Sequence, residues 1–243
     1  MDDEYISIGK AAKILGVTPT TLRAWDKKGK LAAIRTPGGS RRFSIKKIRI
    51  FLGDSLYNQA TEWLDAPNGT LPPSDFYCPN TAVFQSRIED LERDLRQNPA
   101  LDASFSLIVA ATSEIGNNSF DHNIGNWPDI RGICFGYDAA KGQIVLADKG
   151  QGILKTLKRV KPSLNTDAEA LKTAFTEILS GRAPEERGNG LKFVRKVAPI
   201  ANMDIFFQTG NATVEISKEN MRLDIRETPE YISGCFAYIT FKN

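Results

Sequence analysis

A proline-rich segment divides the 243-residue chain into two parts that we expect to fold separately. Residues 66–80 read APNGTLPPSDFYCPN and contain four prolines and one glycine. Proline lacks a backbone N–H and fixes φ, so a run of this composition is typical of a linker. We therefore predict a first domain over residues 1–65, a linker over residues 66–80 and a second domain over residues 81–243.

The two parts carry opposite net charges. Residues 1–54 contain 12 Lys/Arg and 5 Asp/Glu, a balance of +7, whereas the rest of the chain contains 20 and 24, a balance of −4. Between Tyr5 and Gly53 the sequence has 12 cations and a single acid, Asp26. Such a basic segment favours a polyanion, and double-stranded DNA above all, as the partner of the first domain.

The spacing of apolar and turn-forming residues predicts the elements of the first domain. Apolar residues at helical spacing predict a helix over residues 8–15, which Gly16 and Val17 end. Thr18 before Pro19 is typical of an N-cap with proline at the first helical position, so a second helix follows over residues 19–28. Strands at 31–35 and 41–44 flank a glycine turn, and Ser44 caps a third helix that extends toward residue 64. This order predicts a small, mainly α, winged helix-turn-helix.

The second helix and the hairpin tip are the parts of the first domain expected to contact DNA. Leu22 and Trp25 are expected to face the core, which leaves the polar face of the helix for the major groove. The glycines of the turn let the backbone approach phosphates or the minor groove. The predicted DNA-binding residues are Thr20, Thr21 and Arg23 on the helix and Arg35, Arg41 and Arg42 at the wing.

The segments IGKAAKILGVTPTTLRAWDKKGKL and RTPGGSRRFS resemble the winged helix of MerR-type regulators. The resemblance covers most of the first domain and implies sequence-specific binding to double-stranded DNA. It implies that Thr20, Thr21 and Arg23 read the major groove, with Arg41 and Arg42 at the wing, and we expect a homodimer on DNA. MerR regulators continue with a long dimerising helix, whereas this chain continues with prolines.

The second domain combines helices with strand-like runs. Helices are predicted over residues 84–97, 101–123 and 191–200. Strand-like runs follow at 132–137, 143–148, 204–208, 213–217, 222–225 and 235–241. Helices over a largely antiparallel sheet predict an α+β two-layer sandwich.

One stripe of the helix over 101–123 is polar: Glu114, Asn118, Asp121 and His122 follow at i, i+4, i+7 and i+8. Such groups facing inward are costly unless they serve a site. A carboxylate can act as a general base, and an amide oxygen suits Mg²⁺. The solvated face of an amphipathic helix would look the same, so this stripe alone does not define a site.

Two glycine motifs follow this helix in the sequence. Residues 148–152 (DKGQG) come directly after a strand, so Asp148 is presented beside Gly150 and Gly152, where it can accept a hydrogen bond from an exocyclic amine. Residues 187–191 (RGNGL) open a helix, whose free N–H groups and dipole favour phosphate. The three motifs together predict a nucleotide site.

In this order the motifs resemble the GHKL superfamily, which has the Bergerat fold and includes DNA gyrase, the MutL ATPase, a heat-shock chaperone and histidine kinases. The resemblance covers about residues 103–241 and implies binding of ATP with Mg²⁺. It implies Glu114 as general base, Asn118 as magnesium ligand, and Asp148 as the partner of the adenine amino group. Gly150 and Gly152 would lie beside the base, Asp121 and His122 in the site, and Gly188, Gly190 and Leu191 at the phosphates. Residues 153–187 would form a lid, and Cys235 stands where the family places a threonine.

Three functions are compatible with this resemblance. His122 is the single histidine and lies inside the predicted site, which argues against autophosphorylation on histidine. A slow ATPase that switches the DNA-binding domain is the first expectation, with Lys155, Arg187 or Lys192 in place of the lysine that gyrase-like ATPases take from another domain. The alternatives are an anti-sigma-type serine/threonine kinase acting on a partner protein, and a nucleotide sensor without turnover.

The cysteines and the terminus indicate the compartment. Cys78, Cys134 and Cys235 are odd in number and far apart, so we expect small buried thiols rather than disulfides or a zinc site. The acidic start, MDDE, lacks the charge of a secretory signal, and no apolar run is long enough to span a bilayer. We therefore expect a cytoplasmic protein with no membrane partner.

Overall fold

The computed structural model describes residues 5–29, 31–51, 55–177, 190–218 and 223–242. The chain forms two compact units, which we call unit 1 (Met1–Asn58) and unit 2 (Gln59–Asn243). Each unit is described by itself. None of the helices in these ranges is long and apolar enough to cross a membrane.

Unit 1 contains short helices and a three-stranded antiparallel sheet with the order β1-β3-β2. Its elements are β1 (Tyr5–Ser7), α1 (Ile8–Ile14), α2 (Pro19–Lys27), β2 (Ile34–Arg35), β3 (Arg41–Ser44) and α3 (Ile45–Phe51). The two predicted caps are confirmed: the Thr18 side chain accepts from the Thr21 N–H, and Ser44 Oγ accepts from the Lys47 N–H at 2.9 Å. The core of unit 1 consists of Ile6, Ala11, Ala12, Leu22, Leu31, Phe43, Ile45 and Ile48.

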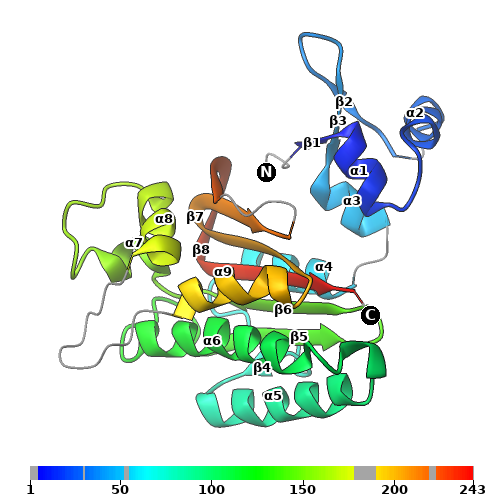
Figure 1. Ribbon diagram of the computed structural model, residues 1–243. Helices are drawn as coiled ribbons and strands as arrows, with labels where there is room; N and C mark the ends of the chain where they lie inside the picture. Colours follow the sequence, from blue (N-terminus) through cyan, green and yellow to red (C-terminus); the bar gives the residue numbers. More distant parts are fainter. Residues whose placement is uncertain (1–4, 30, 52–54, 178–189, 219–222, 243) are drawn as a thin grey trace. The chain divides into compact units, whose positions relative to one another are not determined.

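Unit 2 is built on a five-stranded sheet with the order β4-β5-β6-β8-β7, in which each neighbouring pair is antiparallel. Its strands are β4 (Tyr77–Cys78), β5 (Ile133–Asp138), β6 (Gln143–Asp148), β7 (Met203–Ile216) and β8 (Asp224–Phe241). Its helices after α4 (Ser55–Asp65) are α5 (Thr81–Arg96), α6 (Phe105–Asn123), α7 (Gly152–Leu157), α8 (Asp167–Thr176) and α9 (Gly190–Ile200). The prediction of helices combined with an antiparallel sheet is therefore confirmed (Figure 1).

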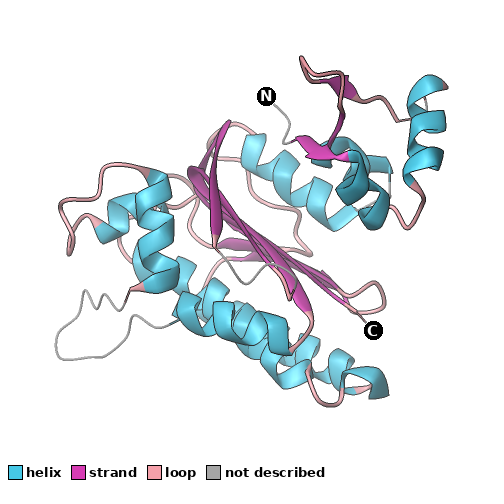
Figure 2. Cartoon of the chain, turned by 45° about the horizontal axis from the view of Figure 1, so that its top comes forward, coloured by secondary structure: helices cyan, strands magenta, loops and turns pink. Residues whose placement is uncertain are grey.

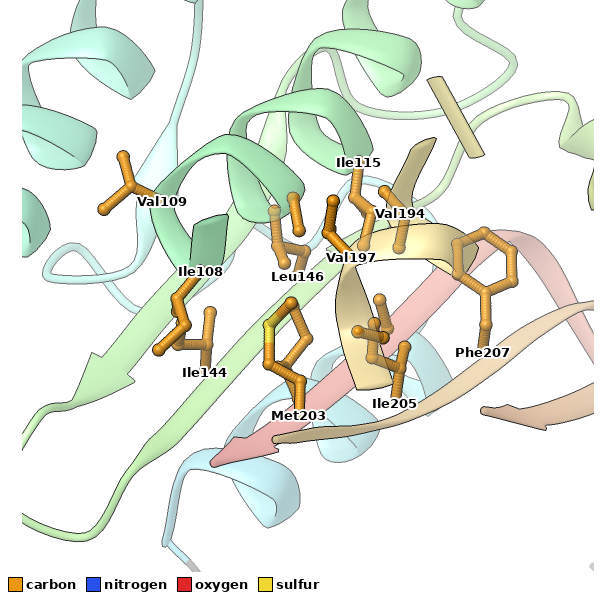
Figure 3. Packing of buried hydrophobic residues seen from close by; sticks show 14 of the residues in the cluster. Ile108, Val109, Ile115, Ile144, Leu146, Val194, Val197, Met203, Ile205 and Phe207 are labelled. Atoms are coloured by element: carbon orange, nitrogen blue, oxygen red, sulfur yellow. The ribbon is translucent and has the colours of Figure 1, made fainter. Parts of the chain in front are cut away.

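Helices α5, α6 and α9 cover one face of this sheet through a large apolar core (Figures 1 and 2). Figure 3 shows Ile115 of α6 and Val194 and Val197 of α9 pointing toward the strands, where Leu146 and Ile205 lie. All five side chains are at most 7% exposed. This packing holds α6 and α9 side by side.

The region between the predicted domains differs from the prediction. The single helix expected from residue 45 to about 64 is two helices, α3 and α4 (Ser55–Asp65), and the unit boundary falls within α4, between Asn58 and Gln59. Residues 66–80, predicted as a linker, belong to unit 2 and supply its edge strand β4. Tyr77 and Cys78 pair there with Cys134 and Ile133 of β5, and Cys78 is fully buried.

The unit 2 part of α4 lies on the face of the sheet opposite α5, α6 and α9 (Figures 1 and 2). Ala60 and Trp63 on this part of α4 are 0% and 3% exposed. On the same side, Tyr238 and Phe236 of β8 are each 2% exposed although they are not part of the core under the other helices. Both faces of the sheet are therefore covered, one by the helical layer and the other in part by α4.

We expect Gly116→Ala to destabilise unit 2. Gly116 of α6 faces the ring of Phe84 on α5, and an added Cβ would overlap the buried ring atom Cζ. Overpacking of this kind costs about 1–3 kcal/mol, which calorimetry or urea unfolding would measure. Phe84→Leu removes the ring that the new methyl group would overlap. The loss of unfolding free energy in the double variant should therefore be smaller than the sum of the losses in the two single variants. A loss equal to that sum would show that the two residues do not clash.

Candidate nucleotide pocket and nucleic-acid interface

Helix α2 of unit 1 presents one exposed face beside a buried one. Leu22 is fully buried, and Trp25 packs against Phe51 with ring centroids 5.0 Å apart, as predicted. Thr20 and Arg23 are exposed, and Lys27 lies on the same face four residues beyond Arg23. Lys27 was missed in the sequence, although its helical spacing from Thr20 and Arg23 indicates the same face.

Thr21 has a different position from its neighbours on α2. It is half-buried, its N–H donates to Thr18 Oγ1, and its hydroxyl lies 3.0 Å from that of Thr18. These bonds belong to the N-terminal cap of the helix. Thr21 was predicted to read DNA, but in this structure its hydroxyl is engaged in the cap.

Asp26, the one acid among the cations of this segment, joins α2 to the wing. Its Oδ1 accepts from the Ala33 N–H at 2.9 Å, and its Oδ2 pairs with Arg41 Nε at 2.6 Å and Arg35 Nη2 at 3.6 Å. The backbone N–H of Ala33, followed by Arg41, holds the pKa of Asp26 below its usual value. Arg41, predicted as a DNA contact, therefore orients the wing, whereas Arg35 keeps half of its side chain exposed. Arg42 is half-buried on β3.

Unit 2 contains a pocket at the edge where α6, α7 and α9 meet the sheet. It encloses about 550 Å³ of free space when its open mouth is included. The lining residues are Ile115, Asn118, Ser119, His122, Asn123, Asp148, Gly152, Ile153, Thr156, Leu157, Ala174, Leu191, Phe207 and Cys235.

Asp148 is the buried acid of this pocket. It ends strand β6 and is 1% exposed. Ser119 Oγ donates to its Oδ2 at 2.7 Å, and the Gly150 N–H donates to its Oδ1 at 2.8 Å. Burial raises the pKa of Asp148 to about 6, although both of these hydrogen bonds favour the carboxylate. A desolvated acid with a perturbed pKa in a pocket is a strong candidate for ligand recognition.

The loop after Asp148 is held in place by Asn123, a residue that sequence reasoning missed. Asn123 is 3% exposed; its amide donates to the Ser119 carbonyl at 2.8 Å, and its Oδ1 accepts from the Gln151 N–H at 2.8 Å. An added Cβ on Gly150 would overlap this amide, which explains the glycine. Asn123 follows Ser119 by one helical turn, but the sequence offers no clear sign that it bonds a distant loop.

Two further glycines near the pocket have a backbone conformation that favours glycine. Gly152 has a φ of +75° and Gly234 a φ of +82°, a region that other residues rarely adopt. An added Cβ on Gly234 would overlap the Asp148 carbonyl. Next to it, Cys235 lines the pocket, 3.7 Å from the Thr209 hydroxyl, and burial raises its pKa well above the usual range.

The start of α9 lies against the polar stripe of α6. An added Cβ on Gly190 would overlap Glu114 Oε2 and lie 3.1 Å from Asn118 Nδ2. Asn118 lines the pocket, whereas Glu114 and Gly190 lie next to each other and do not line it. Gly188 lies outside the described residues.

The stripe of α6 that faces the pocket is rotated from the predicted one. It consists of Ile115, Asn118, Ser119, His122 and Asn123, whereas Asp121 is exposed and does not line the pocket. The apolar Ile115 and the small Ser119 were passed over because the prediction followed charged and amide side chains alone. Of the other predicted residues, Asp148, Gly152 and Leu191 line the pocket.

Two of the cations considered for a phosphate contact differ in environment. Lys155 is exposed on α7, while Ile153 and Thr156 of the same helix line the pocket. Lys192 lies two residues after Gly190; within the described chain its Nζ is buried and makes no hydrogen bond. Burial, and then the nearby Lys196, lower the pKa of Lys192. Arg187 lies outside the described residues.

Comparison with known proteins identifies unit 1. Residues 7–43 match the model of the MerR family regulatory protein. The match spans α1, α2 and most of the wing, so unit 1 carries a MerR-type helix-turn-helix, and it supports a DNA-binding, regulatory role for the protein. A comparison of the whole chain with curated proteins found no match.

We expect Asp148→Asn to stabilise the protein in a pH-dependent way. With a pKa of 3.8 when unfolded and about 6 when folded, the buried charge costs about 3 kcal/mol above pH 6 and nothing below pH 4. The melting temperature of the variant relative to the wild type should therefore rise between pH 4 and pH 7.5. The exposed Asp121→Asn is the control and should give a constant difference; a constant difference for Asp148→Asn would contradict its burial as a charged group.

Arg23→Ala and Arg41→Ala should separate DNA contact from wing orientation. On a duplex that the full-length protein selects from a random pool, Arg23→Ala should weaken binding about tenfold or more without changing the melting temperature. Arg41→Ala leaves Asp26 without its closest cation and should destabilise unit 1 by about 1–3 kcal/mol, visible by calorimetry. Unchanged stability of Arg41→Ala would show that this ion pair does not hold the wing.

Proposed function

We propose that the protein is a DNA-binding regulator whose unit 2 binds ATP with Mg²⁺. The observation that carries this proposal is the convergence of three distant segments on one pocket. Asn118 of α6, Asp148 at the end of β6 and Leu191 at the start of α9 all line it. These segments contain the three motifs that resemble GHKL ATPases, and the antiparallel sheet with helices α6 and α9 on one face is compatible with that fold.

The base of the nucleotide fits the end of the pocket near Asp148. The carboxylate there is an acceptor for the exocyclic amine of adenine, and Ser119 and Gly150 hold its two oxygens in place. Ile115, Leu157 and Phe207 supply apolar surface in the same pocket. Apolar walls with a few fixed polar groups are typical of sites that bind flat ligands.

The phosphates fit the start of α9. Free N–H groups at the N-terminus of an 11-residue helix favour anions. The buried ammonium of Lys192, which has no hydrogen-bond partner among the described residues, also favours a negative group nearby. Asn118 has the amide oxygen that would hold Mg²⁺ together with the phosphates, and the bound ion would neutralise phosphate charge.

Glu114 is the candidate for general base. It lies beside Gly190 at the start of α9, where the phosphates are proposed to bind. A carboxylate in this place can take a proton from water, with a rate gain of about 100-fold or more. Hydrolysis is expected to be slow, and binding rather than turnover would bias the DNA-binding state of unit 1.

We expect Asp148→Asn and Glu114→Ala to affect different steps. Asp148→Asn removes the charged acceptor and should weaken binding of a non-hydrolysable ATP analogue about tenfold to a hundredfold in calorimetry. Glu114→Ala should bind the analogue normally but lose the release of phosphate from ATP. Asp121→Asn, exposed on the same helix, is the matched control and should behave as the wild type.

The outcomes distinguish this function from the alternatives. Unchanged affinity of Asp148→Asn would overturn the assignment of the pocket. Equal, background phosphate release by the wild type and Glu114→Ala, with binding intact, would indicate a nucleotide sensor. Transfer of the γ-phosphate to a co-purifying protein would indicate the kinase.

A further inference from the structure

Lys149 is a buried cation that the proposed nucleotide site does not use. It stands between Asp148 and Gly150, yet it does not line the pocket. Its side chain is 4% exposed. Lysine is almost never buried to this extent without partners, because desolvation of the ammonium is costly.

Two of the three partners of Lys149 lie at the end of α4 and just after it. Its Nζ donates to the Ala66 carbonyl at 2.7 Å and lies 5.4 Å from the ring centroid of Trp63 on α4. The third partner is Asp129, whose Oδ2 is 3.6 Å from the ammonium. A backbone carbonyl, an aromatic face and a carboxylate together compensate the buried charge.

Two of these partners, Trp63 and Asp129, are also bonded to the backbone of residues 69 and 70. Asp129 Oδ1 accepts from the Gly69 N–H at 2.8 Å, and Trp63 Nε1 donates to the Thr70 carbonyl at 2.7 Å. Asp129 Oδ2 is buried and, within the described chain, has no hydrogen bond, so the ammonium of Lys149 is the group that balances it. We call Trp63, Ala66, Gly69, Asp129 and Lys149 the Lys149 cluster.

This geometry makes one peptide unit the link between the pocket and α4. Asp148 ends β6 and lines the pocket, whereas the side chain of Lys149, the next residue, reaches the ring of Trp63 on α4. A ligand that binds Asp148 or changes the conformation of residues 150–152 would also shift the backbone of Lys149. The unit boundary lies within α4, four residues before Trp63.

From this arrangement we infer that Lys149 transmits the occupancy of the pocket to the end of α4 and to residues 66–70. The inference rests on the proposed nucleotide site and adds its route of regulation. Lys149 is a positioning residue in this scheme: it contacts no nucleotide, and its effect passes through Trp63 and Ala66. Loss of the Lys149 ammonium uncouples residues 59–70 from the pocket, while the pocket still binds the nucleotide.

Hydrogen exchange of the full chain, with and without a non-hydrolysable ATP analogue and Mg²⁺, tests this route. In the wild type, peptides covering 148–157 and 59–70 should both change in exchange rate, by about fivefold or more. In Lys149→Met, which keeps the length of the side chain, the first peptide should still respond and the second should not. Lys141→Met removes an exposed lysine at the opposite end of the β5–β6 hairpin and should respond as the wild type.

Each result decides one claim. If the pocket peptide of the wild type responds but residues 59–70 do not, the coupling is overturned and the nucleotide site stands. The same conclusion follows if residues 59–70 respond as strongly in Lys149→Met as in the wild type. If neither peptide responds in the wild type, the proposed nucleotide site fails and the coupling fails with it. Because Lys149→Met leaves Asp129 buried and unbalanced, Lys149→Met/Asp129→Asn removes both charges and provides the same test in a chain with no orphaned acid.

Discussion

The burial of one negative charge, on Asp148, explains most of the local structure of unit 2. A desolvated carboxylate is tolerated only where donors surround it, and here they come from α6 and from the loop that follows β6. Glycine is required at position 150 because a Cβ there would overlap the Asn123 amide. It is required at position 234 because a Cβ there would overlap the Asp148 carbonyl. Asn123 then holds the loop in the shape that this arrangement requires.

Much of this structure could be predicted from the sequence where a local rule decides the outcome. The helix caps at Thr18, before Pro19, and at Ser44 follow from capping preferences, and the hairpin β5–β6 follows from the alternation of side chains along its strands. Neighbouring residues determine both. The polar stripe was predicted on the correct helix, α6. Which face of α6 lines the pocket depends on how Ile115 packs into the core, and this packing is a tertiary property. The position of Asn123 depends on a loop 28 residues away.

The segment 66–80 shows the limit of composition as a guide. Four prolines predict a chain without regular structure, and most of this segment has none, but ordered contacts do not require regular structure. Tyr77 and Cys78 pair with the edge of β5. The backbone of Ala66, Gly69 and Thr70 forms hydrogen bonds with the side chains of Lys149, Asp129 and Trp63, respectively. The runs predicted as four strands in the last 40 residues are likewise two long strands, because a bulge at Gly210 lets β7 continue.

The boundary within α4 has a consequence for how the protein can be dissected. A fragment that begins at residue 66 or 81, as proline content would suggest, loses Trp63, and the shorter one also loses strand β4. Either cut would leave the ammonium of Lys149 without the ring of Trp63. An isolated fragment of unit 2 should therefore retain α4 from Ser55, and an isolated fragment of unit 1 should end before α4.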